Sequence, residues 1–468
     1  MTSTIADDTA FIYDVNKIIN GINYDSAAQL LLEKYDVVRR ADNKECYIYI
    51  DGVYRPYGWD NLERALYETY GGVVQKNGQS VIDKKTINEI LSRVFSLKTV
   101  DPYVLENNLN FLNVRNGIVD MDSRTLQEHS PEIYSFSQID VKYDPNAECP
   151  NFLNFLDEMV EQKYKCVIQE LFGYVLWPEY NINKAFMLLG PKRSGKSTVL
   201  NVLSRMLGRE SISNASLQDL TEKRFTVANL FGKSANICGD LPRKIINDQG
   251  IFKRLTGEDN IQAEYKFKNE FSFMNTAKLI FSANEIPALK YEDDAYYGRW
   301  VIIPFNNSVY GREDTQLLKR LTTDNELSGI LNWALDGLDR LKDNEWQFSY
   351  SDDSIAIYRR KSNPVIAFLE DCCEEYEGYV LKSDLMMAYN RWAKSQNLPP
   401  SKSRKAFSQA ILDQEEIPVE IFRPNIDGDR PEAVEGNSLG HLSHAFFLLI
   451  LYIFPIINRR RIFVTRVT

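Results

Sequence analysis

Residues 185–197 read Ala185-Phe-Met-Leu-Leu-Gly190-Pro-Lys-Arg-Ser-Gly195-Lys196-Ser197. Its first five residues form a short apolar run, which predicts a buried strand. The next eight fit the pattern G-x-x-x-x-G-K-[S/T], and the apolar spacing of residues 198–207 predicts a helix. A strand, a glycine-rich loop and a helix in this order predict an α/β fold with a phosphate-binding loop; a chance match in an unrelated loop is the alternative.

Each part of this loop has an expected task. Backbone N–H groups of the turn surround phosphate oxygens, and the following helix directs the positive end of its dipole at them. Lys196 is expected to contact the β and γ phosphates, and Ser197 to ligate Mg²⁺. The loop therefore predicts a bound nucleoside triphosphate together with Mg²⁺. The predicted nucleotide-binding residues are Gly190, Pro191, Lys192, Arg193, Ser194, Gly195, Lys196, Ser197 and Thr198.

Polar residues end two of the strand-like runs that follow. The run 234–240 (SANICGD) ends at Asp240, where a carboxylate is suited to hold Mg²⁺ and to polarise an attacking water. The run 278–284 (KLIFSAN) ends at Asn284, whose amide is suited to orient water against a γ-phosphate. Simpler explanations stay open, because Asp caps strand and helix ends and Asn favours turns for local reasons.

Five segments occur in one order and spacing: the phosphate loop, GDLP at Gly239, KRLTGEDNIQAEYKFKNEFSF from Lys253, LIFSANEIP from Leu279 and GRWVIIPF from Gly298. Together they resemble superfamily 3 helicases, and most closely the phage and plasmid primase-helicase family, which includes the poxvirus primase-helicase. The likeness covers roughly residues 40–420.

This resemblance implies an ATP-dependent DNA helicase that acts in the replication of a phage, plasmid or related mobile element. It implies an AAA-like P-loop motor that assembles as a homohexameric ring on single-stranded DNA. It also assigns the magnesium-binding acid to Asp240, the polar sensor to Asn284 and the arginine that reaches a neighbour's nucleotide to Arg299. The predicted catalytic residues are thus Lys196, Asp240, Asn284 and Arg299.

The chain departs from the family pattern at two positions. A single acid, Asp240, follows Gly239, whereas family members usually have Glu or a pair of acids there. Gly298 stands where a first arginine often precedes the second, which leaves Arg299 alone. These departures concern the catalytic base and the arginine pair.

The family's DNA-contacting hairpin region reads Glu264-Tyr-Lys-Phe-Lys268 in this chain. Lysines that alternate with aromatic residues present ammonium groups to phosphates and ring faces to bases, so Lys266 and Lys268 are predicted to bind DNA. The alternative is an exposed strand whose Tyr265 and Phe267 are buried on its other side.

Residues 362–430 resemble the family's C-terminal winged-helix module. Lys402, Arg404 and Lys405 are predicted to contact the DNA backbone there, although the same residues would also make a helix start soluble.

The remaining chain is divided by composition. An N-terminal arm (1–25) with apolar Ile12, Val15, Ile18 and Ile19 is expected to be a helix or an extended arm. The expected parts are then an α/β accessory domain (26–150), the P-loop ATPase domain with preceding helices (151–345), the winged-helix-like domain (362–430) and an unassigned hydrophobic and basic tail (431–468).

The tail contains an apolar run at 445–457 that is interrupted by Pro455. It is shorter than the ~20 residues that a membrane-spanning helix needs, so no membrane is expected as a partner, with a C-terminal anchor as the minor alternative.

Composition fits a folded, multidomain enzyme: 468 residues, 44% hydrophobic, 26% charged and a formal net charge of −10. The scattered cysteines and the polar N-terminus predict a reduced, cytoplasmic protein. Because 25 residues cannot contain a primase domain, a separate primase is expected as a partner. Two other functions stay open: an origin-binding replication initiator ATPase that melts duplex DNA with little translocation, and a phosphotransferase that needs no nucleic acid.

Overall fold

The computed structural model of the chain describes residues 11–13, 19–41, 44–101, 109–241, 249–266, 270–287, 294–308, 310–311, 314–350, 364–373, 380–396, 400–401, 403–412, 419–423 and 432–436. Contacts divide the chain into two compact units. The first comprises Met1–Pro242, Asp248–Asn284 and Ile303–Ser351; the second comprises Arg243–Asn247, Glu285–Ile302 and Asp352–Thr468. The apolar tail run at 445–457 lies outside the described residues.

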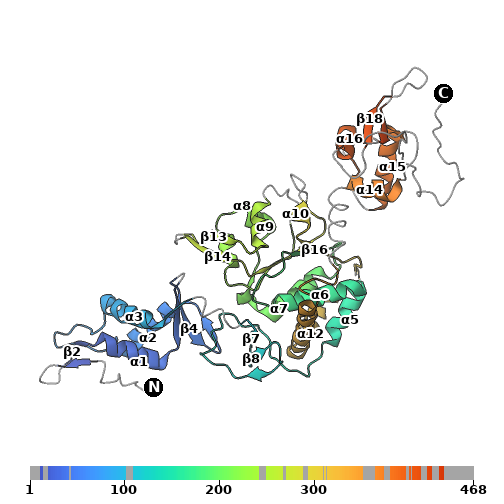
Figure 1. Cartoon of the computed structure of the whole chain (residues 1–468). Helices are drawn as coiled ribbons and strands as arrows, with labels where there is room; N and C mark the ends of the chain where they lie inside the picture. The colour runs from blue at the N-terminus through green and yellow to red at the C-terminus, as the bar shows by residue number, and fades with distance from the viewer. Residues whose placement is uncertain are drawn as a thin grey trace, which may run out of the picture. The chain divides into compact units, whose positions relative to one another are not determined.

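A five-stranded sheet organises the first unit (Figure 1). Its strand order is β11 (Ile212–Ser213), β12 (Ala235–Cys238), β15 (Lys278–Ala283), β10 (Ala185–Leu189) and β16 (Trp300–Pro304). The pairs β11–β12, β12–β15 and β15–β10 are parallel. Strands β10 and β15 are buried along their whole length, as apolar runs in a parallel sheet require. The predicted α/β fold with a parallel sheet is confirmed.

Four helices pack beside this sheet: α5 (Pro150–Met159), α6 (Gln162–Tyr174), α7 (Lys196–Leu207) and α12 (Asp324–Asp343). Helices α6 and α12 cross closely because each has a glycine at the contact. A Cβ at Gly173 would lie 2.5 Å from the Ala334 carbonyl oxygen, and one at Gly337 would lie 2.3 Å from that of Gln169. The buried carboxylate of Glu170 accepts a hydrogen bond from Nε of Arg340 at 2.8 Å, which joins the same two helices.

The N-terminal part of the first unit is a small α/β layer. Helices α1 (Tyr24–Lys34), α2 (Gly58–Tyr70) and α3 (Lys84–Lys98) pack with a four-stranded sheet. Its strand order is β5 (Val53–Arg55), β4 (Cys46–Ile50), β3 (Val37–Arg40) and β6 (Thr99–Val100). Helix α3 begins where Asp83 Oδ1 accepts a hydrogen bond from the Thr86 N–H at 2.7 Å.

Of the two possibilities for the N-terminal arm, the described residues form strands and not a helix. Strands β1 (Phe11–Tyr13) and β2 (Ile19–Ile22) pair antiparallel there. The Phe11 ring packs edge-on against Tyr70 of α2 at 5.8 Å, a tertiary contact that the local apolar spacing does not reveal.

A three-stranded sheet joins this layer to the larger sheet. It contains β7 (Phe111–Val114), β8 (Gly117–Asp120) and β9 (Leu126–Gln127). The turn after β8 is tied to helix α12: Arg124 forms an ion pair with Asp339, and Lys342 Nζ lies 3.0 Å from Asp122 Oδ1. The accessory domain expected at 26–150 therefore lies in the same compact unit as the phosphate loop.

The second unit contains a small helical domain with a three-stranded antiparallel sheet. Its elements in chain order are α14 (Pro364–Cys372), β17 (Val380–Leu381), α15 (Lys382–Ser395), α16 (Arg404–Leu412), β18 (Val419–Phe422) and β19 (Ala433–Gly436). Phe368, Trp392 and Phe407 contribute to its core. Strand β19 pairs with both other strands, so this domain continues beyond the limit of 430 expected from the sequence. Among the residues described in both units, no helix is long and apolar enough to cross a bilayer.

Candidate nucleotide-binding site

The loop between β10 and α7 is fixed by backbone bonds on both sides. The Gly190 N–H donates to the Ala283 carbonyl at 3.2 Å, and the Phe305 N–H donates to the Leu189 carbonyl at 2.7 Å. A Cβ at position 190 would lie 2.1 Å from the Phe305 carbonyl oxygen, so only glycine fits between these strands. Gly195 has a φ of +89°, a value that glycine adopts without strain.

Lys196 lies inside this loop rather than in solvent, with 6% of its surface exposed. Its Nζ donates to the carbonyl oxygens of Gly190 and Pro191 at 2.7 and 2.6 Å and lies 3.3 Å from Asn284 Oδ1. Burial lowers the pKa of this ammonium, and the carboxylate of Asp240 opposes that shift. The ammonium is thus at the centre of the loop.

Asp240 and Asn284 follow neighbouring parallel strands, and the structure brings their backbones together. Cys238 of β12 pairs with Phe281 of β15. Beyond that pair, Ser282 Oγ donates to the Gly239 carbonyl, and the Leu241 N–H donates to the Ser282 carbonyl, both at 2.9 Å. Ser282, which the sequence reasoning missed, therefore fixes the segment that carries Asp240. A small hydroxyl residue inside an apolar strand was the available signal.

The exposed residues of the site provide oxygen ligands. Ser197 is exposed in the first turn of α7, and the Asp240 side chain is exposed at the end of β12. A hydroxyl and a carboxylate suit Mg²⁺, which keeps several waters and takes few protein ligands. In the part of the chain that the structure describes, no cluster of three or more His, Cys, Asp or Glu forms a metal site. The residues present thus fit a magnesium ion held jointly with phosphates.

Arg299 precedes β16 and belongs to the second compact unit, whereas Lys196, Asp240 and Asn284 belong to the first. Its Nη1 donates to the Ala295 carbonyl at 3.1 Å. The structure brings Lys196, Asp240 and Asn284 together around the phosphate loop.

The predicted DNA-contacting segment is a hairpin of β13 (Asn260–Glu264) and β14 (Glu270–Met274). Lys266 is exposed in its turn, and Lys268 and Phe267 lie outside the described residues. The Tyr265 ring stacks on Phe271 at 5.4 Å, and its hydroxyl donates to the Ala228 carbonyl at 3.0 Å. Tyr265 therefore packs within the hairpin, as the alternative explanation expected for this residue.

The basic residues predicted in the C-terminal domain begin a helix. Arg404 and Lys405 are exposed in the first turn of α16, and Lys402 lies outside the described residues.

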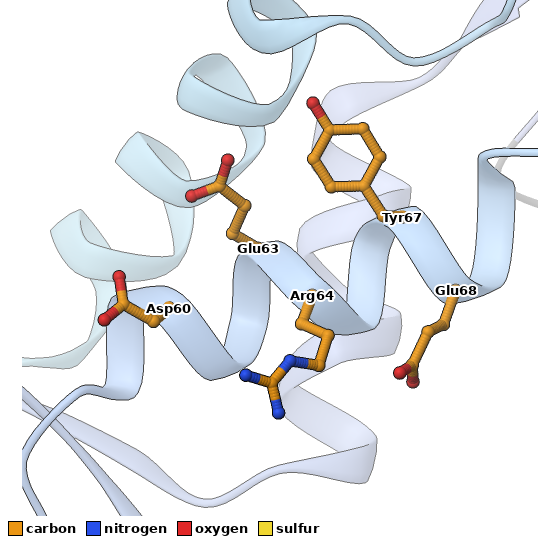
Figure 2. A pocket seen from close by; sticks show the side chains of 5 residues that line it. All are labelled: Asp60, Glu63, Arg64, Tyr67 and Glu68. Atoms are coloured by element: carbon orange, nitrogen blue, oxygen red, sulfur yellow. The ribbon is translucent and has the colours of Figure 1, made fainter.

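A shallow pocket elsewhere in the first unit lies on one helix face. Asp60, Glu63, Arg64, Tyr67 and Glu68 line it, and Figure 2 shows all five side chains projecting from α2. Because its lining comes from a single helix of the accessory part, this pocket is separate from the phosphate loop.

Two stretches of the chain match known protein families. Residues 28–161 match the family described as D5 N terminal like, and residues 188–299 match a family of unknown function, DUF5906. The second match contains the phosphate loop, Asp240 and Asn284.

The curated relatives come from viruses. "Putative helicase L207/L206" of Acanthamoeba polyphaga mimivirus is 25% identical over 239 residues, which are 47% of this chain and 24% of that protein. "Putative helicase 121R" of Invertebrate iridescent virus 3 is 25% identical over 241 residues, which are 45% of this chain and 24% of that protein. The matched part spans about a quarter of the length of these relatives. These relatives and the D5 N terminal like match together show that this chain is similar to D5-like viral helicases.

A solved structure titled "The A form apo structure of NrS-1 C terminal region-CTR" is 13% identical with a TM-score of 0.45, and it covers 87% of this chain and 98% of that chain. "The apo structure of NrS-1 C terminal region" is 13% identical with a TM-score of 0.43, and it covers 88% of this chain and 98% of that chain.

Proposed function

We propose that this chain is an ATP-dependent DNA helicase of superfamily 3 that acts in the replication of a virus, phage or plasmid. One observation carries the proposal. The ammonium of Lys196, inside the phosphate loop, lies 3.3 Å from the Asn284 amide oxygen at the end of the adjacent strand. A lysine and a polar residue from two neighbouring strand ends can therefore contact the same phosphate group.

Lys196 is prepared to exchange its present partners for phosphate oxygens. It now donates to two loop carbonyls, which are weaker acceptors than charged phosphate oxygens. Its burial strengthens any charge interaction it forms, because solvent screening is reduced there. The fixed start of α7 adds backbone donors and a positive dipole end on the same side.

Asp240 and Ser197 would hold Mg²⁺ with the triphosphate, and the metal would neutralise charge that develops on the phosphates. Asp240 would also orient the attacking water, since it is the acid that the Ser282 and Leu241 hydrogen bonds fix beside Lys196. Asn284 would position that water, and its contact with the γ-phosphate would couple the bound nucleotide to β15.

Two exposed basic groups are the proposed DNA contacts. Lys266 lies in the hairpin turn, where the aromatic packing of Tyr265 on Phe271 fixes the strands beneath it. Arg404 and Lys405 place positive charge at the N-terminal end of α16, which the helix dipole disfavours. A bound phosphate would remove that penalty, so this end of α16 is suited to a DNA backbone.

Arg299 would complete the site of a neighbouring subunit in a homohexameric ring. It directly precedes β16, a strand of the sheet that also contains β10 and β15, and the resemblance assigns it to a neighbour's nucleotide. A guanidinium supplied in trans makes hydrolysis depend on assembly.

Strand displacement tests this function. The purified protein with ATP and Mg²⁺ should separate a short labelled strand from a single-stranded circle, and single-stranded DNA should stimulate its ATPase. Lys196→Ala should lose both activities. ATP hydrolysis that DNA does not stimulate, without displacement of a strand, would refute the proposal. Protection of a specific duplex sequence without displacement would instead indicate an origin-binding initiator.

A further inference from the structure

The segment that follows β16 lies against the phosphate loop. Asn307 Nδ2 donates to the Glu158 carbonyl at the end of α5 at 2.8 Å, and Ser308 Oγ donates to the Lys192 carbonyl at 3.3 Å. The Tyr310 N–H in turn donates to Ser308 Oγ at 3.4 Å. Tyr310 is therefore held at the edge of the loop that contains Lys192.

Tyr310 has an aromatic ring that the fold does not bury. Its exposed fraction of 77% is the largest among the big apolar side chains in the part of the chain described. The guanidinium of Arg193, in the phosphate loop itself, lies 4.8 Å from the ring centroid. Arg193 has a φ of +60°, so the loop accepts an unusual backbone conformation at the residue that contacts this ring.

The exposed ring of Tyr310 contributes little to the stability of the fold. A cation–π contact at an exposed site stabilises the fold only weakly, and an uncovered ring contributes little hydrophobic burial. With Arg193 on one side and most of its surface in solvent, the ring still has area on which a second flat group can stack.

We propose that Tyr310, braced by Arg193, stacks on the base of the nucleoside triphosphate whose phosphates occupy the loop. This inference rests on the proposed ATP-binding function and extends it to the recognition of the base. A nucleotide anchored through its phosphates must place its base near the border of the loop, and Tyr310 is an exposed aromatic side chain tied to that border. Stacking uses the π face that every base has, so the site accepts nucleoside triphosphates in general and binds purines more tightly because their ring surface is larger.

Equilibrium binding separates this role from a structural one. Isothermal titration calorimetry would measure ATP and inorganic tripolyphosphate, each with Mg²⁺, against the wild type, Tyr310→Ala and Tyr310→Phe. Tyr310→Ala removes the ring on which the base would stack, so it should weaken ATP binding on the order of tenfold. It should leave tripolyphosphate binding unchanged, because tripolyphosphate has no base. Tyr310→Phe keeps the ring and should bind ATP within about twofold of the wild type.

Tyr57→Ala is the matched control, since Tyr57 is also exposed, at 71%, and lies in the N-terminal layer. It should change neither affinity. Equal ATP affinity for Tyr310→Ala and the wild type would overturn the inference, as would an equal loss of ATP and tripolyphosphate binding. Weakened single-stranded DNA binding with unchanged ATP affinity would also overturn it and would assign the ring to DNA. If the wild type binds no ATP, the proposed function is overturned as well. If the wild type binds ATP tightly and Tyr310→Ala binds it equally well, only the stacking role is rejected.

Discussion

Replacing Asn284 by Asp tests the meeting of Lys196 and Asn284 at the centre of the site. The substitution changes an amide into a carboxylate of nearly the same shape. The resulting charge would lie 3.3 Å from the Lys196 ammonium, if the present geometry is kept. At that distance, opposite unit charges attract by about 5 kcal/mol at an effective dielectric constant of 20 and by about 1 kcal/mol in water.

The expected effect lies between these limits, because Lys196 is buried and the side chain at 284 is exposed. The new ion pair competes with the phosphates for the same ammonium, and its carboxylate repels them. Asn284→Asp should therefore weaken ATP binding about tenfold to a hundredfold, equivalent to about 1.4–2.8 kcal/mol.

Isothermal titration calorimetry with ATP and Mg²⁺ would measure the effect, and Asn284→Ala is the matched control. Asn284→Ala removes the amide without adding charge, so it should bind ATP nearly as the wild type does and hydrolyse it slowly. ATP affinity within about twofold of the wild type in Asn284→Asp would refute the reasoning that the two side chains share one phosphate position.

Three further outcomes are expected. Burial lowers the pKa of Lys278 to about 7, so the folded protein loses this proton above pH 7 while the unfolded chain keeps it. Lys278→Met should therefore have a higher free energy of unfolding than the wild type near and below pH 7. In denaturant titrations this difference should shrink by about 1.4 kcal/mol per pH unit above 7. A difference that does not depend on pH would contradict the burial of an amine that is neutral above pH 7. Arg299→Ala subunits should bind ATP but hydrolyse it poorly, and mixing them with Lys196→Ala subunits should restore part of the ATPase; mixed rings without recovery would exclude an arginine that acts in trans. The double variant Lys266→Ala, Lys268→Ala should bind single-stranded DNA with a weaker salt dependence. The slope of log affinity against log salt should fall by about one unit for each phosphate contact that is lost, while ATPase activity without DNA persists. An unchanged slope would show that neither lysine contacts DNA.

The local parts of the fold could be predicted from the sequence because their signals are short-range. The apolar runs that contain β10, β12, β15 and β16 are each bounded by turn formers or polar residues, and all four are strands. The order of these strands in the sheet could not be predicted, because it depends on pairing between segments far apart in the chain. The place of β15 between β12 and β10 is such a pairing, and it is what brings Asn284 to Lys196.

Candidate residues were predictable by type but not by environment. The spacing of the loop identifies Lys196, but it does not show that the ammonium is buried among loop carbonyls. Likewise the alternation at Tyr265 left open whether its ring contacts bases or packs within the hairpin, and the structure stacks that ring on Phe271. Lys278 was not singled out at all. Its ammonium donates to the Trp177 carbonyl and lies 4.8 Å from the Tyr174 ring centroid, contacts with a segment about a hundred residues earlier.

The contact between the turn after β8 and helix α12 limits where genes for related proteins can exchange segments. Arg124 forms an ion pair with Asp339, and burial raises the pKa of nearby Asp336, whose charge Arg124 helps to stabilise. A segment inherited without residues 109–149 would keep these acids on α12 and lose the arginine that pairs with them. Exchange between related genes is therefore expected to cut before β7 rather than at the start of α5, so that the small sheet is inherited together with the phosphate loop.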